Sequence, residues 1–512
     1  MNRRIAAAGV IWTLAILLSR VVGLVRERVL GATLGATGTA DVYAAAFRIP
    51  DLANYVLASG ALSLTLLPIL AVHIERGDDA RSSRTFSTIA NAVVGFALVV
   101  LTTVWMLCPL FVTWLAPGFD AEQTQLLIHL TRIVLPAQLF FAVSPLLQAS
   151  LLSRDHHAVA ALTPLLYTGC VIAGGLIGGS AEGFAWGVLV GAAIGPFGLQ
   201  LAAALRAGLR WSPILHARDP DLRTFVVRFI PIVVGQSIVV WDDAIATRLA
   251  SGMGVGQIAI LNYAKTIMKV PMGVFGAAMG LAAFPTLTRL CIEGKPGEAY
   301  RTIVASTRQV LFLAFGSQVV LTVSGGEVAT AIYTTARITP AQIDTLGVCV
   351  GLYALALGAW SAQAVLFRGF YARGITWLPT WLGTAVLLAA LPVYSWFSAA
   401  WGAYGIAAAS SVAIVVYTVL LEVVLRRQIG EGPGYAGFLA RAVPAVVIAI
   451  AIGFALRQFA PPPSYTVLAA ILRGGVFAGV SGGVFVALAR AFGVSEAGAL
   501  VSAVTRRVSR AR

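Results

Sequence analysis

The sequence predicts an all-α protein that crosses a membrane many times. Of its 512 residues, 59% are hydrophobic and only 11% are charged, and the mean hydropathy is +0.87. Soluble domains carry about one quarter charged residues, so the composition excludes that class. The basic residues recur in short clusters between apolar segments, which is typical of a positive-inside topology. The net charge of +15 therefore predicts orientation in a bilayer, and we expect no nucleic-acid binding.

Apolar windows of about 20 residues divide the chain into fourteen predicted spans. They cover residues 5–33, 39–73, 85–115, 123–153, 157–179, 183–207, 225–250, 256–288, 301–324, 343–370, 376–398, 401–425, 437–458 and 465–492. The first span continues past signal-peptide length, so we expect it to remain in the mature protein. No GxxxxGK[ST] motif and no sizeable extramembrane segment remain, which argues against ATP hydrolysis by this chain.

The loops between these spans differ in charge from one side to the other. The basic clusters, including those near both ends of the chain, fall on one side. The other side carries Asp120, Glu122, Glu182, Glu327 and Asp344, with Arg337 as the one clear exception. We therefore expect both termini in the cytoplasm. The four cysteines are isolated in or beside apolar segments, which favours packing over a disulfide or metal role.

An internal repeat organises the spans. A shift of 217 residues places Gly35 on Gly252, Arg48 on Lys265 and Pro68 on Pro285. The pattern predicts two pseudo-symmetric six-helix lobes, residues 1–218 and 219–430, followed by a helix pair with a basic tail, 431–512. Repeated halves around a midplane site are the usual build of a secondary transporter. The added pair would support assembly or form a groove for a lipid tail.

The first span carries charge where a bilayer-spanning helix should carry none. Ser19 and Arg26 lie on one helical stripe, and Arg20 and Glu27 lie on a second about 100° away. Charges inside a membrane are costly, so they usually face a cavity and mark a transport path. Arginine suits bidentate contact with phosphate oxygens. A cationic cavity for an anionic, phosphate-bearing substrate is the favoured interpretation, and mutually neutralising ion pairs are the alternative.

The second span repeats this pattern. Asp41 and Arg48 are seven residues apart, which predicts that they share one helical face. Pro50 follows, and proline inside a helix kinks or interrupts it and frees backbone groups. We therefore expect an irregular segment beside the cavity.

The second half contributes charges of its own. Asp242 and Asp243 lie in the seventh span, and Lys265 and Lys269, one turn apart, lie in the eighth. The 217-residue shift makes Lys265 the counterpart of Arg48, so each half can offer one cation to a shared cavity. Pairing of Asp242 or Asp243 with these lysines is an equally favoured alternative. A membrane carboxylate can also bind Na⁺ or a proton.

Several ordered motifs resemble the MviN/MurJ family, the lipid II flippases of peptidoglycan synthesis. They are SRVVGLVRE at 19–27, LGATGTADVYAAAFRIPDL at 34–52, ASGALS at 58–63, LPIL at 67–70, GFAWGVLVGA at 183–192, LNYAK at 261–265, PMGVFG at 271–276 and FYAR at 370–373. The resemblance covers nearly the whole chain. It implies fourteen spans in two six-helix lobes around a central cationic cavity, with a final helix pair.

The resemblance also implies roles for individual residues. Positions that line the family's cavity match Ser19, Arg20, Arg26, Asp41 and Arg48, whose arginines would hold a lipid pyrophosphate, and Glu27 replaces an aspartate.

Other positions depart from the family's pattern. Asn54 and Tyr55 replace a basic pair, and Ser59 replaces a frequent glutamate. Lys265 and Lys269 keep positive charge in the eighth span, but at positions that differ from that of the arginine in some family members. Asp242 or Asp243 resembles an acidic residue tied to Na⁺ binding, but span 376–398 has no Asn or Asp to complete such a site.

The expected function is that of a lipid II flippase in the bacterial cytoplasmic membrane, working by alternating access without catalytic residues, metal or cofactor. We expect the membrane potential, in preference to a Na⁺ gradient, to drive transport. Coupling to H⁺ is a further alternative. Expected partners are lipid II and membrane lipids, with peptidoglycan synthases and division proteins as further candidates. Alternatives are a flippase for another undecaprenyl-linked oligosaccharide, a drug/cation antiporter of the same fold, a membrane glycosyltransferase, and a non-transporting scaffold.

Overall fold

The structure, a computed structural model, is built from helices. It describes residues 3–500 and 502, apart from 59–60, 155, 157, 235–237, 336, 376, 430–433 and 461–464. Within these residues the elements are α-helices and one π-helical segment, and no strand occurs. The prediction of an all-α protein is confirmed.

Seven of the described helices are long and apolar enough to cross a membrane, or eight if one pair bent by 40° counts as a single span. This test takes in only the described residues. The protein is thus an integral membrane protein with many spans, and the count of fourteen stays a prediction.

The chain forms two compact units, Met1–Ile258 and Ala259–Arg512. The first unit therefore extends beyond residue 218, where the sequence repeat places the end of the first lobe. The division into 1–218, 219–430 and 431–512 follows the repeat and remains a prediction.

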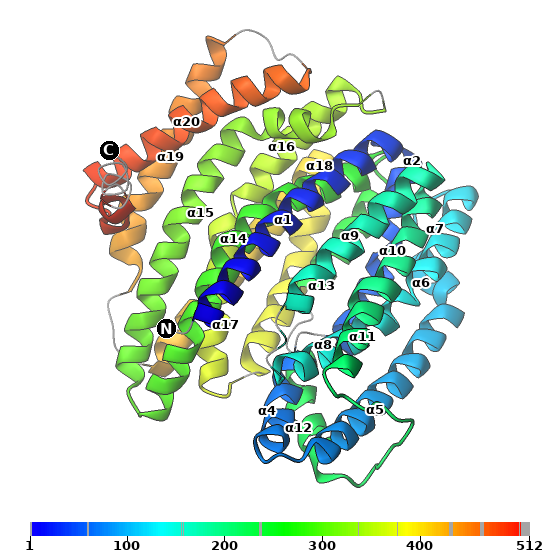
Figure 1. Ribbon diagram of the computed structural model, residues 1–512. Helices are drawn as coiled ribbons and strands as arrows, with labels where there is room; N and C mark the ends of the chain where they lie inside the picture. Colours follow the sequence, from blue (N-terminus) through cyan, green and yellow to red (C-terminus); the bar gives the residue numbers. More distant parts are fainter. Residues whose placement is uncertain are drawn as a thin grey trace. The chain divides into compact units, whose positions relative to one another are not determined.

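The first unit contains fourteen helical elements in the described residues (Figure 1). They are α1 (Arg3–Leu34), α2 (Gly38–Ala46), α3 (Arg48–Ala58), α4 (Ala61–Glu75), α5 (Asp79–Met106), α6 (Cys108–Leu115), α7 (Ala121–Val134), α8 (Ala137–Leu152), α9 (Ala158–Gly178), α10 (Ala181–Ala192), the π-helix η1 (Ala193–Leu199), α11 (Gln200–Arg206), α12 (Pro220–Val234) and α13 (Ile238–Ala250). Helix α9 packs against α1 and α10, and α8 packs against α3, α4 and α5. Helices α12 and α13 pack against α4 and α3, respectively, so they belong to this unit.

The second predicted span, 39–73, is not one continuous helix, because α2 ends at Ala46 and α3 begins at Arg48. Thr37 caps α2 by accepting a hydrogen bond from the Ala40 amide, and α2 ends at Ala46. The break falls there because Pro50 has no N–H to donate to the Ala46 carbonyl and its ring clashes with that group. Asp41 and Arg48 therefore lie on two helices, α2 and α3, and their sharing of one helical face stays a prediction.

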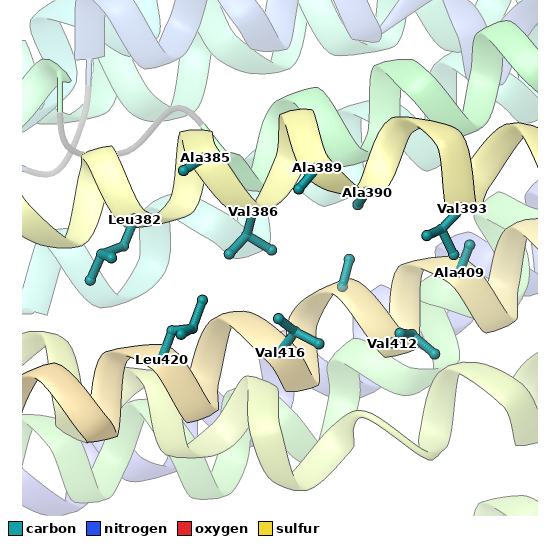
Figure 2. Close-up of a pocket in the computed structure, with 11 residues that line it drawn as sticks. Leu382, Ala385, Val386, Ala389, Ala390, Val393, Ala409, Val412, Val416 and Leu420 are labelled. Carbon is teal, nitrogen blue, oxygen red and sulfur yellow. The ribbon is translucent and has the colours of Figure 1, made fainter.

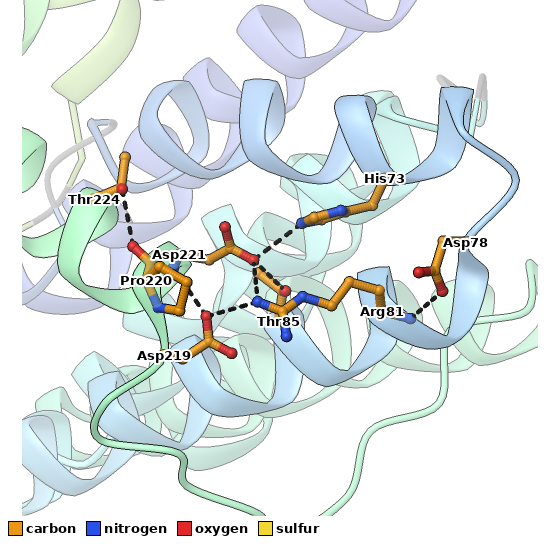
Figure 3. Close-up of polar contacts among 8 residues, drawn as sticks. All are labelled: His73, Asp78, Arg81, Thr85, Asp219, Pro220, Asp221 and Thr224. Atoms are coloured by element: carbon orange, nitrogen blue, oxygen red, sulfur yellow. Dashed lines mark hydrogen bonds and ion pairs between the residues drawn. The ribbon is translucent and has the colours of Figure 1, made fainter.

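A polar cluster joins one end of α12 to α4 and α5 (Figure 3). Arg81 Nη2 lies 3.0 Å from both Asp219 Oδ1 and Asp221 Oδ2. Asp221 Oδ2 also accepts a 2.8 Å hydrogen bond from Thr85 Oγ1 and lies 3.0 Å from His73 Nε2. Burial raises the pKa of Asp221. Hydrogen bonds from Thr85, His73 and Arg81, together with the positive charge of Arg81, lower this pKa by more, so the net shift is downward. The ionised carboxylate of Asp221 therefore holds the start of α12 to α4 and α5.

The second unit is organised around one long helix, α15. Its helices are α14 (Gln257–Ile292), α15 (Pro296–Tyr333), α16 (Pro340–Ala354), α17 (Leu357–Ala372), α18 (Trp377–Ile429), α19 (Ala436–Gln458) and α20 (Val467–Ala491). Helix α15 packs against α16, α17, α19 and α20, and Figure 1 shows α19 and α20 (orange to red) beside it. The last two helices are thus part of this unit's core.

Helix α18 is two helices joined at a sharp turn. Gly402 has a φ of +58°, a left-handed conformation that glycine adopts without strain. A Cβ at Gly405 would lie only 1.9 Å from the Phe397 carbonyl oxygen, so the turn also needs glycine there. The two arms correspond to the predicted spans 376–398 and 401–425. Between them lies an apolar groove of about 350 Å³, lined from Leu382 to Leu420 (Figure 2).

Candidate functional site

Arg48 forms the centre of a buried ionic cluster in the first unit. The break after α2 makes Arg48 the first residue of α3, and only 9% of the residue is exposed. Its Nε donates a 3.1 Å hydrogen bond to Thr247 Oγ1. Its Nη1 lies 3.6 Å from Asp243 Oδ2. The cluster therefore links α3 to α13.

Asp243 and Thr247 reach Arg48 together because they are four residues apart, one turn along the same face of α13. Thr247 also donates a 2.8 Å hydrogen bond to the Asp243 carbonyl oxygen. Neighbouring Asp242 is 3% exposed. Sequence analysis selected both aspartates but missed Thr247, which the i, i+4 spacing from Asp243 could have indicated.

The guanidinium of Arg48 has chemistry suited to a phosphate. It keeps its charge when buried, and its five N–H donors form a planar fork. The 3.6 Å separation from Asp243 is longer than the roughly 2.7–2.9 Å of a strong charge-assisted hydrogen bond.

Asp41 contacts the segment that follows α13. It is 2% exposed, and its Oδ2 accepts a 2.5 Å hydrogen bond from the Gly256 backbone amide. Gly256 has a φ of +87°, so this carboxylate holds a tight turn in the segment that follows α13.

Arg26 and Glu27 form a local ion pair near the end of α1. Arg26 Nη2 lies 2.6 Å from Glu27 Oε1, and Arg26 Nε donates to the same oxygen at 3.2 Å. The side chain of Arg26 is 35% exposed, against 7% for Glu27. Arg26 is therefore more accessible to a ligand than Arg48. Ser19, on the same helix, is half-buried.

The remaining predicted residues of the first unit are only partly described. Asn54 donates to Gln138 Oε1 on α8, and Gln138 is buried. Ser59 lies outside the described residues, as does the side chain of Arg20. The structure thus brings Arg48 together with Asp243 and binds Asn54 into the helix packing.

Lys265 is the predicted cation of the second unit, and it is 4% exposed. Its Nζ lies 5.7 Å from the centre of the Tyr353 ring and 5.9 Å from that of Trp360, within cation–π range. Lys269, one turn further along α14, is half-buried. The repeat partners Arg48 and Lys265 therefore differ locally: one begins a helix after a break, and the other lies within a continuous helix.

The fold of this chain matches the folds of solved transporter structures. A solved structure of a lipid II flippase MurJ in an inward closed conformation matches with a TM-score of 0.74, at 18% identity over 93% of this chain and 98% of that one. An inward-facing multidrug resistance MATE family transporter of the MOP superfamily matches with a TM-score of 0.66, at 14% identity over 82% of this chain and 98% of that one. The protein thus has the fold of this transporter superfamily.

Sequence comparison identifies the family. Residues 30–472 match the family described as lipid II flippase MurJ. A probable lipid II flippase MurJ of Rhizobium tropici is 30% identical over 70% of this chain and 69% of its own length. One of Vibrio cholerae is 26% identical over 82% and 83%, and the lipid II flippase MurJ of Burkholderia cenocepacia is 25% identical over 84% and 86%. The chain belongs to the MurJ family of lipid II flippases.

Proposed function

We propose that this protein is a lipid II flippase, which moves the undecaprenyl-pyrophosphate-linked peptidoglycan precursor from the cytoplasmic to the periplasmic leaflet. The observation that carries the proposal is the family match over residues 30–472, which includes the buried charges of α2, α3, α13 and α14. The protein acts by alternating access of its two lobes and without covalent chemistry. It resides in the bacterial cytoplasmic membrane with both termini in the cytoplasm, as the basic loops favour.

The arginines of the first lobe bind the pyrophosphate. Arg26, being the more exposed, meets the substrate first. Arg48 follows when a phosphate oxygen replaces Asp243 as its partner. Arg20, Ser19, Glu27 and Asn54 line the same path, and Lys265 and Lys269 supply the positive charge of the second lobe. Exchange of one anion for another avoids leaving a buried guanidinium unpaired at any stage.

A second candidate function is transport of another undecaprenyl-linked oligosaccharide or of a drug in exchange for a cation. The structural match to a MATE transporter supports this candidate, because the two proteins share a fold. Membership of the MurJ family favours lipid II over these substrates.

Peptidoglycan synthases and division proteins are proposed partners, because a precursor flippase would supply them.

The proposal predicts complementation. In a bacterium depleted of its own lipid II flippase, expression of this chain should restore growth. Arg26→Ala should insert but fail to restore growth, because the exposed phosphate contact is lost, whereas Arg427→Ala, at an exposed position near the end of α18, should behave as wild type. Absence of growth at wild-type membrane levels, together with no lipid II translocation by the purified protein in vesicles, would overturn the proposal.

We further propose that the membrane potential drives the cycle. Each charge that crosses the whole field is worth about 2.3 kcal/mol per 100 mV, so a cationic empty carrier can be reset by the potential. Transport in proteoliposomes should rise with an imposed potential and change little with Na⁺. Transport that ignores the potential, depends steeply on Na⁺ and loses this dependence in Asp242→Asn or Asp243→Asn would contradict this and place a Na⁺ site on α13.

A further inference from the structure

A second groove lies within the second unit, between α15, α16 and α19. It has a volume of about 360 Å³ and differs from the groove of Figure 2 in having charged residues at one end. Arg457 and Asp344 lie at that end, and Val348, Leu355 and Phe454 are among its apolar lining residues. We call it the α15–α16–α19 groove.

The helix packing sets the depth of each lining residue. A Cβ at Gly347 would lie 2.6 Å from the Gly326 Cα, whereas a Cβ at Gly351 would lie 3.5 Å from the Thr322 Cα. Thr322 is therefore one turn deeper than the Gly326–Gly347 contact. Asp344, in the first turns of α16, lies on the opposite side of that contact, at the mouth.

The lining residues of helix α19 follow the same order of depth, with the charged residue nearest the mouth. Arg457 is in its last turn and lies close to Gly326, and Phe454 is about one turn deeper. The groove thus has a charged mouth and an apolar interior that reaches Leu355. Such an order matches an amphiphile with one polar end.

Arg457 belongs to a triad of charged side chains at the mouth. Arg457 Nη2 and Arg473 Nε each lie 3.1 Å from Glu327 Oε1, so this triad has a net charge of one positive unit. Arg457 also donates to the Val323 carbonyl oxygen. These two contacts use two of the five N–H donors of Arg457, and its side chain is 25% exposed.

Asp344 supplies the opposite charge. It is exposed and accepts a 2.9 Å hydrogen bond from the Tyr465 hydroxyl through Oδ2. A ligand with only negative charge would meet this carboxylate unfavourably. A headgroup with both a phosphate and an ammonium group satisfies both residues.

We infer that the α15–α16–α19 groove binds a phospholipid with a phosphoethanolamine headgroup, whose phosphate contacts Arg457 and whose ammonium group contacts Asp344. An acyl chain lies along Val348, Leu355 and Phe454. This lipid is a bound constituent of the second unit, and the inference does not rest on the proposed transport function.

The test is lipid retention by the purified full-length protein, measured by native mass spectrometry. The probes are phosphatidylethanolamine, phosphatidylcholine and phosphatidylglycerol with identical acyl chains. We expect wild type to retain phosphatidylethanolamine about tenfold better than the other two, since only its ammonium group donates charge-assisted hydrogen bonds to a carboxylate. In Asp344→Asn this preference should disappear, while the amide oxygen still accepts from Tyr465.

A second variant tests the position of the acyl chain. Val348 is 50% exposed in the groove, so Val348→Trp should fill the groove and reduce retention of all three lipids. Val419→Trp is the matched control, because Val419 is exposed on α18 and lines neither groove. Equal retention of the three headgroups by wild type, or unchanged retention in Val348→Trp, would overturn the inference. A failure of complementation would not affect this result.

Discussion

Replacement of Arg48 by alanine should abolish lipid II transport while the protein still inserts in the membrane. Arg48 is 9% exposed and contacts Thr247 and Asp243 on another helix. Its removal takes away a phosphate-binding fork and also leaves Asp243 buried without this partner. Loss of one member of a buried ion pair costs about 3–5 kcal/mol, so reduced thermal stability should accompany the loss of transport.

A double variant separates the two effects. In Arg48→Ala/Asp243→Asn the negative charge that faced Arg48 is gone as well, so part of the lost stability should return. Transport should not return, because no guanidinium is left to bind the pyrophosphate. The measurements are the midpoint of thermal unfolding and the accessibility of lipid II at the outer leaflet.

Two control variants test whether Arg48 binds the pyrophosphate. Arg223→Ala removes an exposed cation from α12 and should leave both measurements unchanged. Arg48→Lys keeps the charge but loses the fork, so it should retain partial transport. If the double variant transports lipid II at the wild-type rate, Arg48 is a structural residue and the alternative of a neutralising ion pair is correct.

The sequence predicted the helices well because apolar length determines where a chain can cross a bilayer. Residues 437–458 and 465–492 were predicted as the last two spans, and the helices run Ala436–Gln458 and Val467–Ala491. The prediction was poorer inside the spans. Pro50 signalled an irregularity, but the break falls four residues earlier, after Ala46, since proline acts on the preceding turn.

The charged residues show a similar limit. Sequence analysis selected Arg48 and Asp243 as intramembrane charges. Periodicity could not show that they lie side by side, because the two residues are 195 positions apart in the chain. It treated Glu327 as a loop charge and missed Arg457 and Arg473 altogether. Each of these three residues lies near the end of an apolar helix, where a charge is usually explained by contact with water.

The structure gives Glu327 a central role in the second unit, and its removal should have a large effect on stability. Glu327 is 5% exposed, and through Oε1 it contacts one arginine from each of α19 and α20 at 3.1 Å. It is thus the shared partner that holds both helices to α15. In Glu327→Ala two largely buried guanidinium groups lose this carboxylate, and the expected destabilisation is about 3–5 kcal/mol.

The expected result is a lower midpoint of thermal unfolding and faster proteolysis in the α19–α20 region of the detergent-solubilised protein. Glu298→Ala is the matched control, since Glu298 is an exposed carboxylate in the first turn of the same helix. Glu327→Gln should fall between the two, because the amide oxygen still accepts hydrogen bonds but carries no charge. Equal unfolding midpoints for Glu327→Ala and Glu298→Ala would mean that apolar packing alone holds α19 and α20 to α15. The two arginines would then be explained by their cation–π contacts with Phe477, at 5.7 Å for Arg457 and 5.3 Å for Arg473.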